Sequence, residues 1–498
     1  TIKKNLGLSA SYGSHNYING SIRGGITSRI IHSEIYLSVR QSDGYIENTD
    51  FTNFSVFLNN HIKIKNNRLQ IQGGYLNKGF GANSFYSEQY PDEYEHIQSF
   101  FSGIRFVKNG RLKILPALYF RQLLDRFELF REDKNWYQQQ NGFYINGNDT
   151  AGFGGGIYYT GHNHHRTRVA GIDFPMQFTG KFGATSLGME YRFEHILSNV
   201  LGEPQDSVKV PGSNAWFTNH AERDNWTGYV NHTIYLANFN IAAGCMANYN
   251  SNFGFQWYPG MDVSWKISDK FRVFWAVNKS MRFPTFTDLY YNSPTNAGNV
   301  DLTPETSVNY ETGVKQYRPY IQNHISIFYR QGKNSIDWVR KSDTLKWESR
   351  NHTQINAYGI EARHTFYINK RFQKIPVEYF RTGYAYTCLA KEEKDFESKY
   401  ALDFLEHKFV VDIQHSITEK LYCTWQFLFQ DRSGIYYING EENEYEPFFL
   451  TNIKIIWKLK NVKFFSTCSN LFNIRYFDYG GLYMPGRWIK GGVRINFL

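Results

Sequence analysis

Apolar and polar residues alternate with a period of two along most of this 498-residue chain. In the C-terminal stretch 488–497 one predicted face is apolar or small and the other is polar: Ile489, Gly491, Val493, Ile495 and Phe497 against Trp488, Lys490, Gly492, Arg494 and Asn496. Such alternation describes a strand between an apolar environment and water. It recurs at 34–40, 308–315 and 452–459, with no competing helical period. The pattern predicts an all-β chain whose final strand closes a barrel.

The connections between predicted strands are of two kinds that take turns along the chain. Short turns fall at 108–111, 179–183, 268–270, 418–420 and 460–461. Long polar loops fall near 78–96, 131–165, 196–222, 282–304, 332–352, 391–404, 432–446 and 471–486. Short periplasmic turns on one rim and long extracellular loops on the other are typical of outer-membrane barrels.

Counting the alternating runs yields 23 strand candidates, an odd number that a single-chain bacterial barrel should not have. The Gly-rich candidate Gly152–Tyr159 is the one we reject, which makes 131–165 one long loop. The remaining runs predict a transmembrane antiparallel β-barrel of about 22 strands. It forms one domain, 1–498, in the outer membrane of a Gram-negative bacterium, with both termini on the periplasmic rim.

Composition and charge agree with such a barrel and exclude several other classes. Aromatic residues make up 18%, mean hydropathy is −0.52, and no run approaches the roughly 18 apolar residues that a membrane helix needs. The net charge of +10 is spread along the chain without a basic face interleaved with aromatics, so we expect no nucleic-acid partner. The four cysteines show no CxxC spacing.

Two motifs in order carry a family resemblance. The first runs from Arg282 through Pro284 to Tyr290 and continues at Leu302–Ser307 with Pro304 and Glu305. The second consists of Asn470-Leu-Phe, then Pro485, Gly486 and Arg487, then Gly492 and the penultimate Phe497. The chain resembles TonB-dependent outer-membrane receptors in these motifs, and the barrel resemblance covers essentially its whole length.

Both motifs also have a structural interpretation from the residues alone. Pro304 cannot donate to a β-ladder, so a strand is expected to begin after it, at Glu305–Ser307. Pro485-Gly486 is a turn dipeptide leading into the last strand. We expect Arg487 to form a pair or hydrogen bond near the barrel wall rather than to contact substrate.

The resemblance implies an N-terminal plug inside the barrel and a short box that engages the energy-transducing TonB complex. Here Leu6, Leu8 and Ala10 already alternate with Asn5, Gly7 and Ser9 as a first barrel strand. We therefore expect the plug to have been removed or to be another chain, since a barrel this wide without one encloses an aqueous lumen. Thr1-Ile-Lys-Lys-Asn-Leu is likewise no signal peptide, which is expected of a mature or trimmed form.

Three cargo classes follow from the resemblance: ferric siderophores, haem and cobalamin. Haem receptors of this kind usually carry a His between the two parts of the first motif, and 285–300 contains none. The stretches Pro284–Val300 and Glu194–Gly202 are similar to cobalamin transporters, so cobalamin or a related corrinoid is the first expectation, siderophore the second. Candidate contacts are the loop aromatics, with girdle or loop packing as the alternative: Trp136, Tyr137, Trp216, Tyr290 and Tyr291.

Two polar clusters are weaker candidates for metal binding. Asp43, Glu47 and Asp50 offer hard oxygen ligands for calcium, as does the acidic run 441–444, although acidic loops are usually just solvated. His162, His164 and His165 lie in the fourth long loop and could ligate a metal or haem; a solvated loop cluster is the more frequent outcome.

The partners expected besides the plug and TonB are outer-membrane lipid, lipopolysaccharide and, as in some relatives, a surface lipoprotein. A plugless diffusion porin is the main alternative from another class. An enzyme is not expected, because neither a Ser/His/acid constellation nor a pair of carboxylates stands out.

Overall fold

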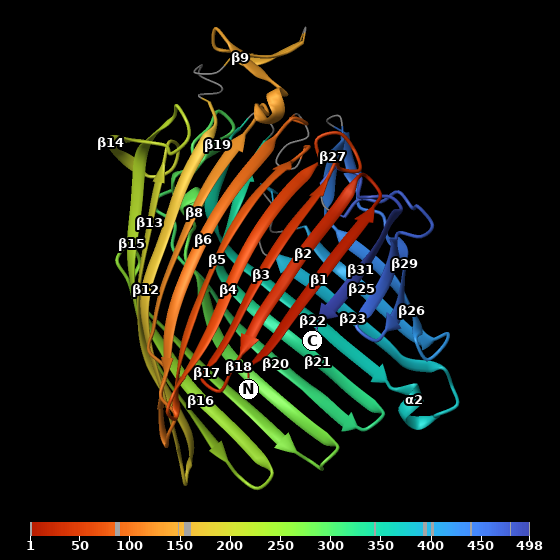
Figure 1. Cartoon of the computed structure of the whole chain (residues 1–498). Coiled ribbons are helices and arrows are strands. Elements are labelled where there is room, and N and C mark those ends of the chain that lie inside the picture. The colour runs from red at the N-terminus through yellow and green to blue at the C-terminus, as the bar shows by residue number, and fades with distance from the viewer. Residues whose placement is uncertain are drawn as a thin grey trace.

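The computed structural model describes residues 2–84, 90–147, 149–153, 161–342, 345–391, 396–399, 403–438, 441–478 and 480–497. Within these residues one antiparallel barrel of 22 wall strands dominates, as predicted (Figure 1). The wall strands are β1 (Lys3–Gly13), β2 (Tyr17–Thr27), β3 (Ile31–Ser42), β4 (Phe51–Ile64), β5 (Asn67–Gly81), β6 (Tyr94–Val107), β8 (Ala117–Glu128), β12 (Asn163–Gly180), β13 (Gly183–Ser198), β15 (Trp216–Tyr235), β16 (Phe239–Asn250), β17 (Gly254–Lys266), β18 (Phe271–Arg282), β20 (Glu305–Arg318), β21 (Ile321–Arg340), β22 (Trp347–Phe366), β23 (Val377–Lys391), β25 (Phe404–Ser416), β26 (Leu421–Ser433), β29 (Phe448–Leu459), β30 (Val462–Ser469) and β31 (Trp488–Phe497).

Short elements complete the described chain. They are β7 (Leu112–Ile114), β9 (Gln138–Gln140), β10 (Phe143–Asn146), β11 (Asp149–Phe153), β14 (Glu203–Lys209), β19 (Asn296–Ala297), β24 (Glu397–Ser398), β27 (Ile435–Ile438), β28 (Glu441–Glu444), the 3-10 helix η1 (Asp133–Asn135), α1 (Phe286–Tyr290) and α2 (Ile368–Arg371). No helix in the described residues is long and apolar enough to cross a membrane.

The last strand closes the barrel on the first. β31 pairs antiparallel with β1 from Leu6↔Phe497 to Gly13↔Lys490, and no sheet edge is left at this seam. Phe497 is 46% exposed on the outer wall, whereas the Lys490 ammonium lies 4.4 Å from the Tyr17 ring on the inner side. The alternation in the final strand therefore reported its two faces correctly.

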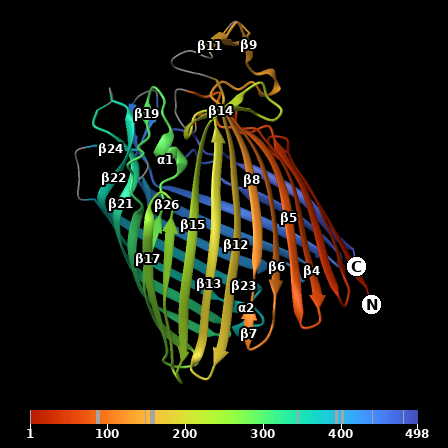
Figure 2. The same ribbon diagram turned by 90° about the vertical axis from the view of Figure 1, so that its left-hand side faces the viewer.

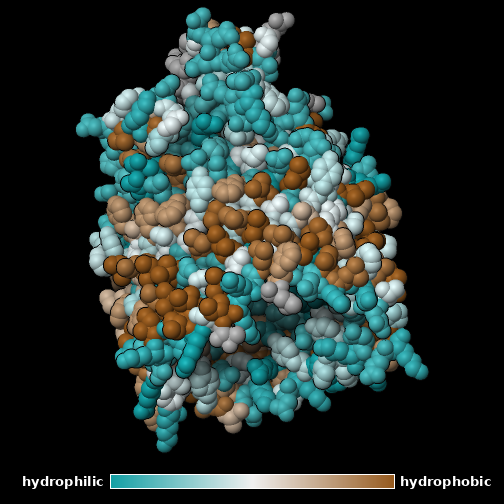
Figure 3. Space-filling model, in the orientation of Figure 1, coloured by the Kyte–Doolittle hydropathy of each residue, from teal (hydrophilic) through white to brown (hydrophobic). Residues whose placement is uncertain are grey.

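The outer wall carries an apolar band. Figure 3 shows brown side chains around the middle of the visible face, with teal residues above and below. Outward residues such as Ile172, Trp257 and Ile327 are 53%, 56% and 55% exposed. So many exposed apolar side chains would be unfavourable in water but are favourable against lipid. A closed barrel can lie in lipid because all its backbone N–H and C=O groups are paired.

The two rims differ as predicted, with exceptions. Figure 2 shows α1, β14 and β19 at the loop-bearing rim and α2 at the opposite rim. The connections at 14–16 and 251–253 are short although they lie on the loop-bearing rim, and the turn holding α2 is long for its rim. The predicted loop 332–352 is wrong: β21 continues to Arg340 and β22 begins at Trp347, because these strands extend beyond the band where one face must be apolar.

The segment between β8 and β12 forms one long extracellular excursion. It contains η1 and a three-stranded sheet of β9, β10 and β11, visible above the barrel in Figure 1. Gly152 and Phe153 end β11 rather than forming a wall strand, and residues 154–160 of the rejected candidate lie outside the described residues. Gly152 and Phe153 are therefore not part of a barrel strand, as predicted.

Candidate binding site at the loop-bearing rim

The connection from β18 to β20 is held by a salt bridge at its base. Arg282 and Glu305 are directly opposite each other in the ladder. The Arg282 guanidinium donates to both carboxylate oxygens of Glu305 at 2.8 Å, a bidentate pair of high geometric specificity. Glu305 also accepts from the backbone N–H of Ile336 at 2.5 Å. β20 begins at Glu305 directly after buried Pro304, as the missing donor of proline predicted.

Helix α1 starts from a complete capping box inside this connection. The Thr285 hydroxyl accepts from the Asp288 backbone N–H at 3.0 Å, and the Asp288 carboxylate accepts from the Thr285 backbone N–H at 3.0 Å. The preceding Pro284 is less than 2% exposed. These contacts satisfy donors at the helix start that would otherwise be unpaired, which fixes the short helix in place.

Arg223 of β15 ties this helix to the neighbouring strand. Its guanidinium donates to the Pro284 carbonyl at 2.9 Å and to the Glu194 carboxylate at 2.7 Å. The guanidinium also lies 4.8 Å from the ring of Phe286. Arg223 thereby connects Glu194–Gly202 with Pro284–Tyr291, two stretches that are far apart in the sequence.

The same two stretches share a hydrophobic cluster. Buried Ile196 and Leu201 pack with buried Phe286, and the half-buried Tyr290 and Tyr291 pack against them. A second cluster beneath the helix contains Leu289, Leu302 and Ile336. Because α1 is buried on these sides, Tyr290 and Tyr291 are held at a defined position beside the mouth of the barrel.

The five predicted aromatic contacts do not form one site. Tyr137 is 5% exposed and donates its hydroxyl to Asp92 at 2.8 Å, within a loop cluster that Trp136 also packs against. Trp216 is 49% exposed at the start of β15, with the Lys209 ammonium 4.9 Å from its ring. Trp136 and Tyr137 share one loop cluster, Tyr290 and Tyr291 pack against another, and Trp216 belongs to neither.

Asp50 is engaged by cations from another loop. Its carboxylate receives two hydrogen bonds from Arg131 at 2.6 and 3.0 Å and one from Lys134 at 2.9 Å. Burial by itself would raise the pKa of Asp50, but these two cations outweigh burial and hold the pKa below its ordinary value. Arg131 is fully buried and also donates to Asn48 at 2.7 Å.

The other calcium candidates lie apart from Asp50. Asp43 accepts from Asn16 at 2.6 Å, and the Glu47 side chain is exposed. No group of three or more His, Cys, Asp or Glu side chains is placed to hold a metal ion in the described ranges. Calcium binding at Asp43, Glu47 and Asp50 therefore remains a prediction without a preformed ligand set.

His164 is buried, His162 and His165 are partly buried, and β12 contains both His164 and His165, so the interpretation of the cluster as a solvated loop feature is wrong. His164 is 6% exposed, and its backbone N–H donates to the Asn199 side-chain oxygen at 2.8 Å. His162 contacts the Glu132 carboxylate at 2.7 Å, and His165 shares a hydrogen bond with Ser198 at 2.9 Å. Glu132 and Tyr144 of the long loop contact the His162 ring, and such tertiary packing leaves no signal in the local sequence.

The C-terminal motif makes backbone contacts at the same rim. The Arg487 guanidinium donates to the Leu471 carbonyl at 2.9 Å, and its backbone N–H donates to Asn473 at 2.8 Å. A side chain at Gly486 would meet the Asn473 side-chain oxygen at 2.5 Å, which explains glycine there. Asn470 donates to the Pro485 carbonyl at 3.3 Å. The motif folds the last loop into β31.

A family model described as "TonB dependent receptor-like, beta-barrel" matches residues 79–471. The chain belongs to this family. It is therefore an outer-membrane β-barrel of a Gram-negative bacterium, from a family of receptors and transporters.

Curated relatives of this TonB-dependent receptor barrel are distant. The vitamin B12 transporter BtuB of Vibrio vulnificus is 29% identical over 164 residues, 32% of this chain and 26% of the relative. BtuB of Photobacterium profundum is 21% identical, covering 47% of this chain and 40% of the relative. An iron-regulated outer membrane virulence protein of Vibrio cholerae is 21% identical, with 46% and 37% covered. The chain thus spans less than half the length of these relatives.

Solved structures share the fold across the whole chain. The copper transporter OprC has a TM-score of 0.78 at 10% identity, covering 100% of this chain and 80% of that one. The FrpB iron transporter of Neisseria meningitidis has a TM-score of 0.75 at 12% identity, covering 99% and 81%. The siderophore receptor PirA of Pseudomonas aeruginosa has a TM-score of 0.68 at 13% identity, covering 100% and 80%. At these identities the likeness concerns the fold alone.

The receptor barrel also presents residues at its mouth that the sequence interpretation did not identify. Trp338 lies 6.4 Å from Tyr291 in a T-shaped arrangement. The Arg340 guanidinium lies 4.5 Å and the Lys399 ammonium 5.7 Å from the ring of Trp347. Burial lowers the pKa of Lys399. They were missed because 332–352 and 391–404 were assigned to polar loops; the tryptophans within polar runs were the available signal.

Proposed function

We propose that this chain forms the wall and extracellular mouth of an active-transport receptor that binds and imports cobalamin or a related corrinoid. One observation carries the proposal. The two stretches that are similar to cobalamin transporters, Glu194–Gly202 and Pro284–Tyr291, are joined by Arg223 and by the cluster around Phe286. The BtuB relatives add support from the sequence.

The chemistry of the rim suits such a cargo. A corrinoid is bulky and carries many amides, so it is bound well by aromatic faces together with hydrogen-bonding groups. Tyr290 and Tyr291, with the partly buried Trp347, supply the aromatic faces, and the buried Trp338 packs against Tyr291 from the side. We propose Tyr290, Tyr291 and Trp347 as cargo contacts, while Trp338, Trp136, Tyr137 and Trp216 have structural or peripheral roles.

A ferric siderophore is the second candidate, because Arg340 and Lys399 place two cations beside Trp347. An anionic ferric chelate would use these cations directly. Arg340 is already paired with Glu397 at 2.7 Å, which reduces the positive charge available to a ligand. Corrinoid therefore stands first. Haem receives no support from the buried histidines.

The remaining parts of the transport machine are also proposals. A plug polypeptide fills the lumen, and TonB pulls on it to release cargo inward, as the family resemblance implies. Lipopolysaccharide surrounds the outer wall, and a surface lipoprotein caps the loops. The proposed activity is transport and not catalysis, and the plug distinguishes it from a diffusion porin.

Binding of cyanocobalamin, tested against ferric siderophores and haem by titration of the purified protein, decides the cargo. Nanomolar cobalamin affinity is expected, and micromolar or weaker affinity would remove cobalamin as the cargo. The variant Tyr291→Ala should weaken binding, whereas Trp216→Ala is the matched control because Trp216 lies apart from α1. In planar bilayers, the protein from native membranes should be silent; steady conductance would favour the porin.

A further inference from the structure

Five neighbouring strands place a basic residue at the same level of the inner wall near the short-turn rim. The ladder pairs Lys266 with Arg272, Arg272 with Lys315, Lys315 with His324, and His324 with Arg363. Directly opposed residues in antiparallel strands point to the same face. These residues, named here the basic arc, therefore form one row across β17, β18, β20, β21 and β22.

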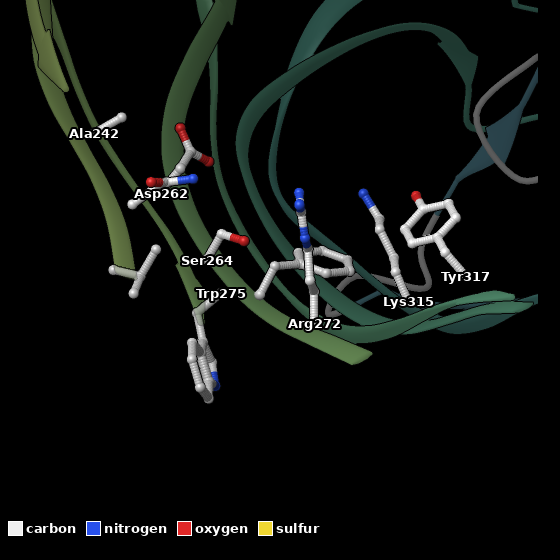
Figure 4. A pocket seen from close by; sticks show the side chains of 10 residues that line it. Ala242, Asp262, Ser264, Arg272, Trp275, Lys315 and Tyr317 are labelled. Carbon is white, nitrogen blue, oxygen red and sulfur yellow. The ribbon is translucent and has the colours of Figure 1, made fainter. Parts of the chain in front are cut away.

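The basic arc faces the lumen. Alternate residues on the same strands, Trp265, Val314 and Ile325, are 37%, 41% and 51% exposed on the lipid side. Figure 4 shows Arg272 and Lys315 projecting side by side from one face of the wall, while Trp275 points to the opposite side. Both cations line a recess of about 310 Å³.

The carboxylates of the wall neutralise the arc only in part. Arg272, Lys315 and Arg363 form no salt bridge with any residue that the structure describes, and the Lys315 ammonium lies 4.5 Å from the Phe274 ring. The ammonium of Lys266 is bound to Asp269 at 2.5 Å. The wall acids Asp262, Glu311 and Glu361 share the inner face, one or two rows further from the turns.

Like charges directly opposite each other in a ladder repel, so the arc is stabilised by an anion. Adjacent strands lie about 4.8 Å apart, and the three intervals from Arg272 to Arg363, beyond the paired Lys266, therefore extend over about 14 Å of wall. One inorganic anion covers a single interval. An acidic polypeptide with several carboxylates matches the whole length.

We propose that the basic arc is a docking strip for an acidic segment of the polypeptide that occupies the lumen. This inference rests on the proposed function, since it takes the lumen to hold a plug. The arc holds the acidic segment by several exposed ion pairs, each individually weak and sensitive to salt. Such an attachment is firm at rest and is released in steps when the segment is pulled.

The test measures binding of a fluorescein-labelled octapeptide of alternating Glu and Ser to the detergent-purified chain by anisotropy. Replacing Arg272, Lys315 and Arg363 together by Gln should weaken binding at least about fivefold at low salt, because three exposed ion pairs are lost. The control variant replaces the exposed turn residues Lys65, Lys108 and Lys181 by Gln, an equal change in net charge, and should bind like the wild type. The charge-keeping variant Arg272→Lys, Lys315→Arg, Arg363→Lys should retain binding and shows that the site tolerates substitution.

Equal peptide affinity in the Gln triple variant and the wild type would overturn the proposal. The proposal would also be overturned if phosphate displaced the peptide much more strongly than chloride does at the same ionic strength. That result would indicate a site for a small anion. The peptide experiment and the cobalamin experiment test different hypotheses. Cobalamin binding without peptide binding refutes only the docking role of the basic arc. Peptide binding without cobalamin binding refutes only the cargo assignment.

Discussion

Arg223→Ala is the most direct test of how the rim positions its cargo contacts. The substitution removes the hydrogen bond to the Pro284 carbonyl and the ring contact with Phe286, both of which hold the α1 segment. Glu194 keeps a second partner, since Arg192 contacts it at 2.8 Å. The substitution therefore mainly weakens the attachment of α1 and does not leave the Glu194 carboxylate unpaired.

The magnitude follows from the contacts that are lost. A hydrogen bond from a charged donor contributes about 1.5–3 kcal/mol, and a partly buried cation–π contact adds about 0.5–1 kcal/mol. The side chain of Arg223 is only 12% exposed, so solvent replaces these contacts poorly. Docking of α1 should weaken by about 2–4 kcal/mol, and each 1.4 kcal/mol is a factor of ten. If only about 1 kcal/mol of this loss, half of the lower estimate, reaches the binding free energy, cobalamin affinity falls about fivefold.

Titration of cyanocobalamin against wild type, Arg223→Ala and Arg223→Lys provides the measurement. Arg223→Lys keeps the charge but cannot make both contacts at once, so its affinity should fall between the other two. Arg192→Ala, which removes the other partner of Glu194 without touching α1, is the control and should bind nearly as well as the wild type. Wild-type affinity in a folded Arg223→Ala protein would refute the idea that α1 must be anchored.

Three further outcomes can be checked. Arg131→Met should raise hydrogen exchange in 43–50 and 129–137 at least tenfold, because breaking a buried pair costs about 3 kcal/mol; unchanged protection would refute the link between these loops. Because the pKa of Asp50 is lower in the folded protein than in the unfolded chain, its ionised carboxylate stabilises the same loops at neutral pH. This stabilisation is lost as the pH falls through the folded pKa of Asp50. Protease cleavage of these loops should therefore begin below about pH 4 and not near pH 6. Thr285→Ala removes the cap of α1 and should cost about 1 kcal/mol, seen as weaker cobalamin binding than in the Thr285→Ser control.

The sequence predicted the wall well because lipid imposes a strict rule on it. Within the apolar band every second residue must be apolar, and this rule predicted the final strand. The start of a strand after Pro304 was predicted because proline has no backbone N–H to donate. The rule ends where strands leave the band. The upper parts of β21 and β22 mix polar residues with Ile336, Trp338 and Trp347 without a strict alternation, and 332–352 therefore resembled a loop.

The site was less predictable because it depends on contacts between distant loops. Tyr290 and Tyr291 were identified beside a recognisable motif, but their neighbours Trp338 and Trp347 come from other strands. The histidines at 162–165 were misjudged for the same reason. Alternation reports which face of a strand a residue occupies, and it carries no information on which loop will cover it.

The seam between β1 and β31 has a consequence for the order of folding. Neighbours elsewhere in the wall are adjacent or nearly adjacent along the chain, whereas the bonds between Ser14 and Ile489 join residues 475 positions apart. Closing a ring of that length costs about 5–6 kcal/mol of chain entropy, only slightly more than a ring half as long. The wall can therefore grow as a sheet by local hairpins, and a single late, non-local step converts the sheet into a cylinder.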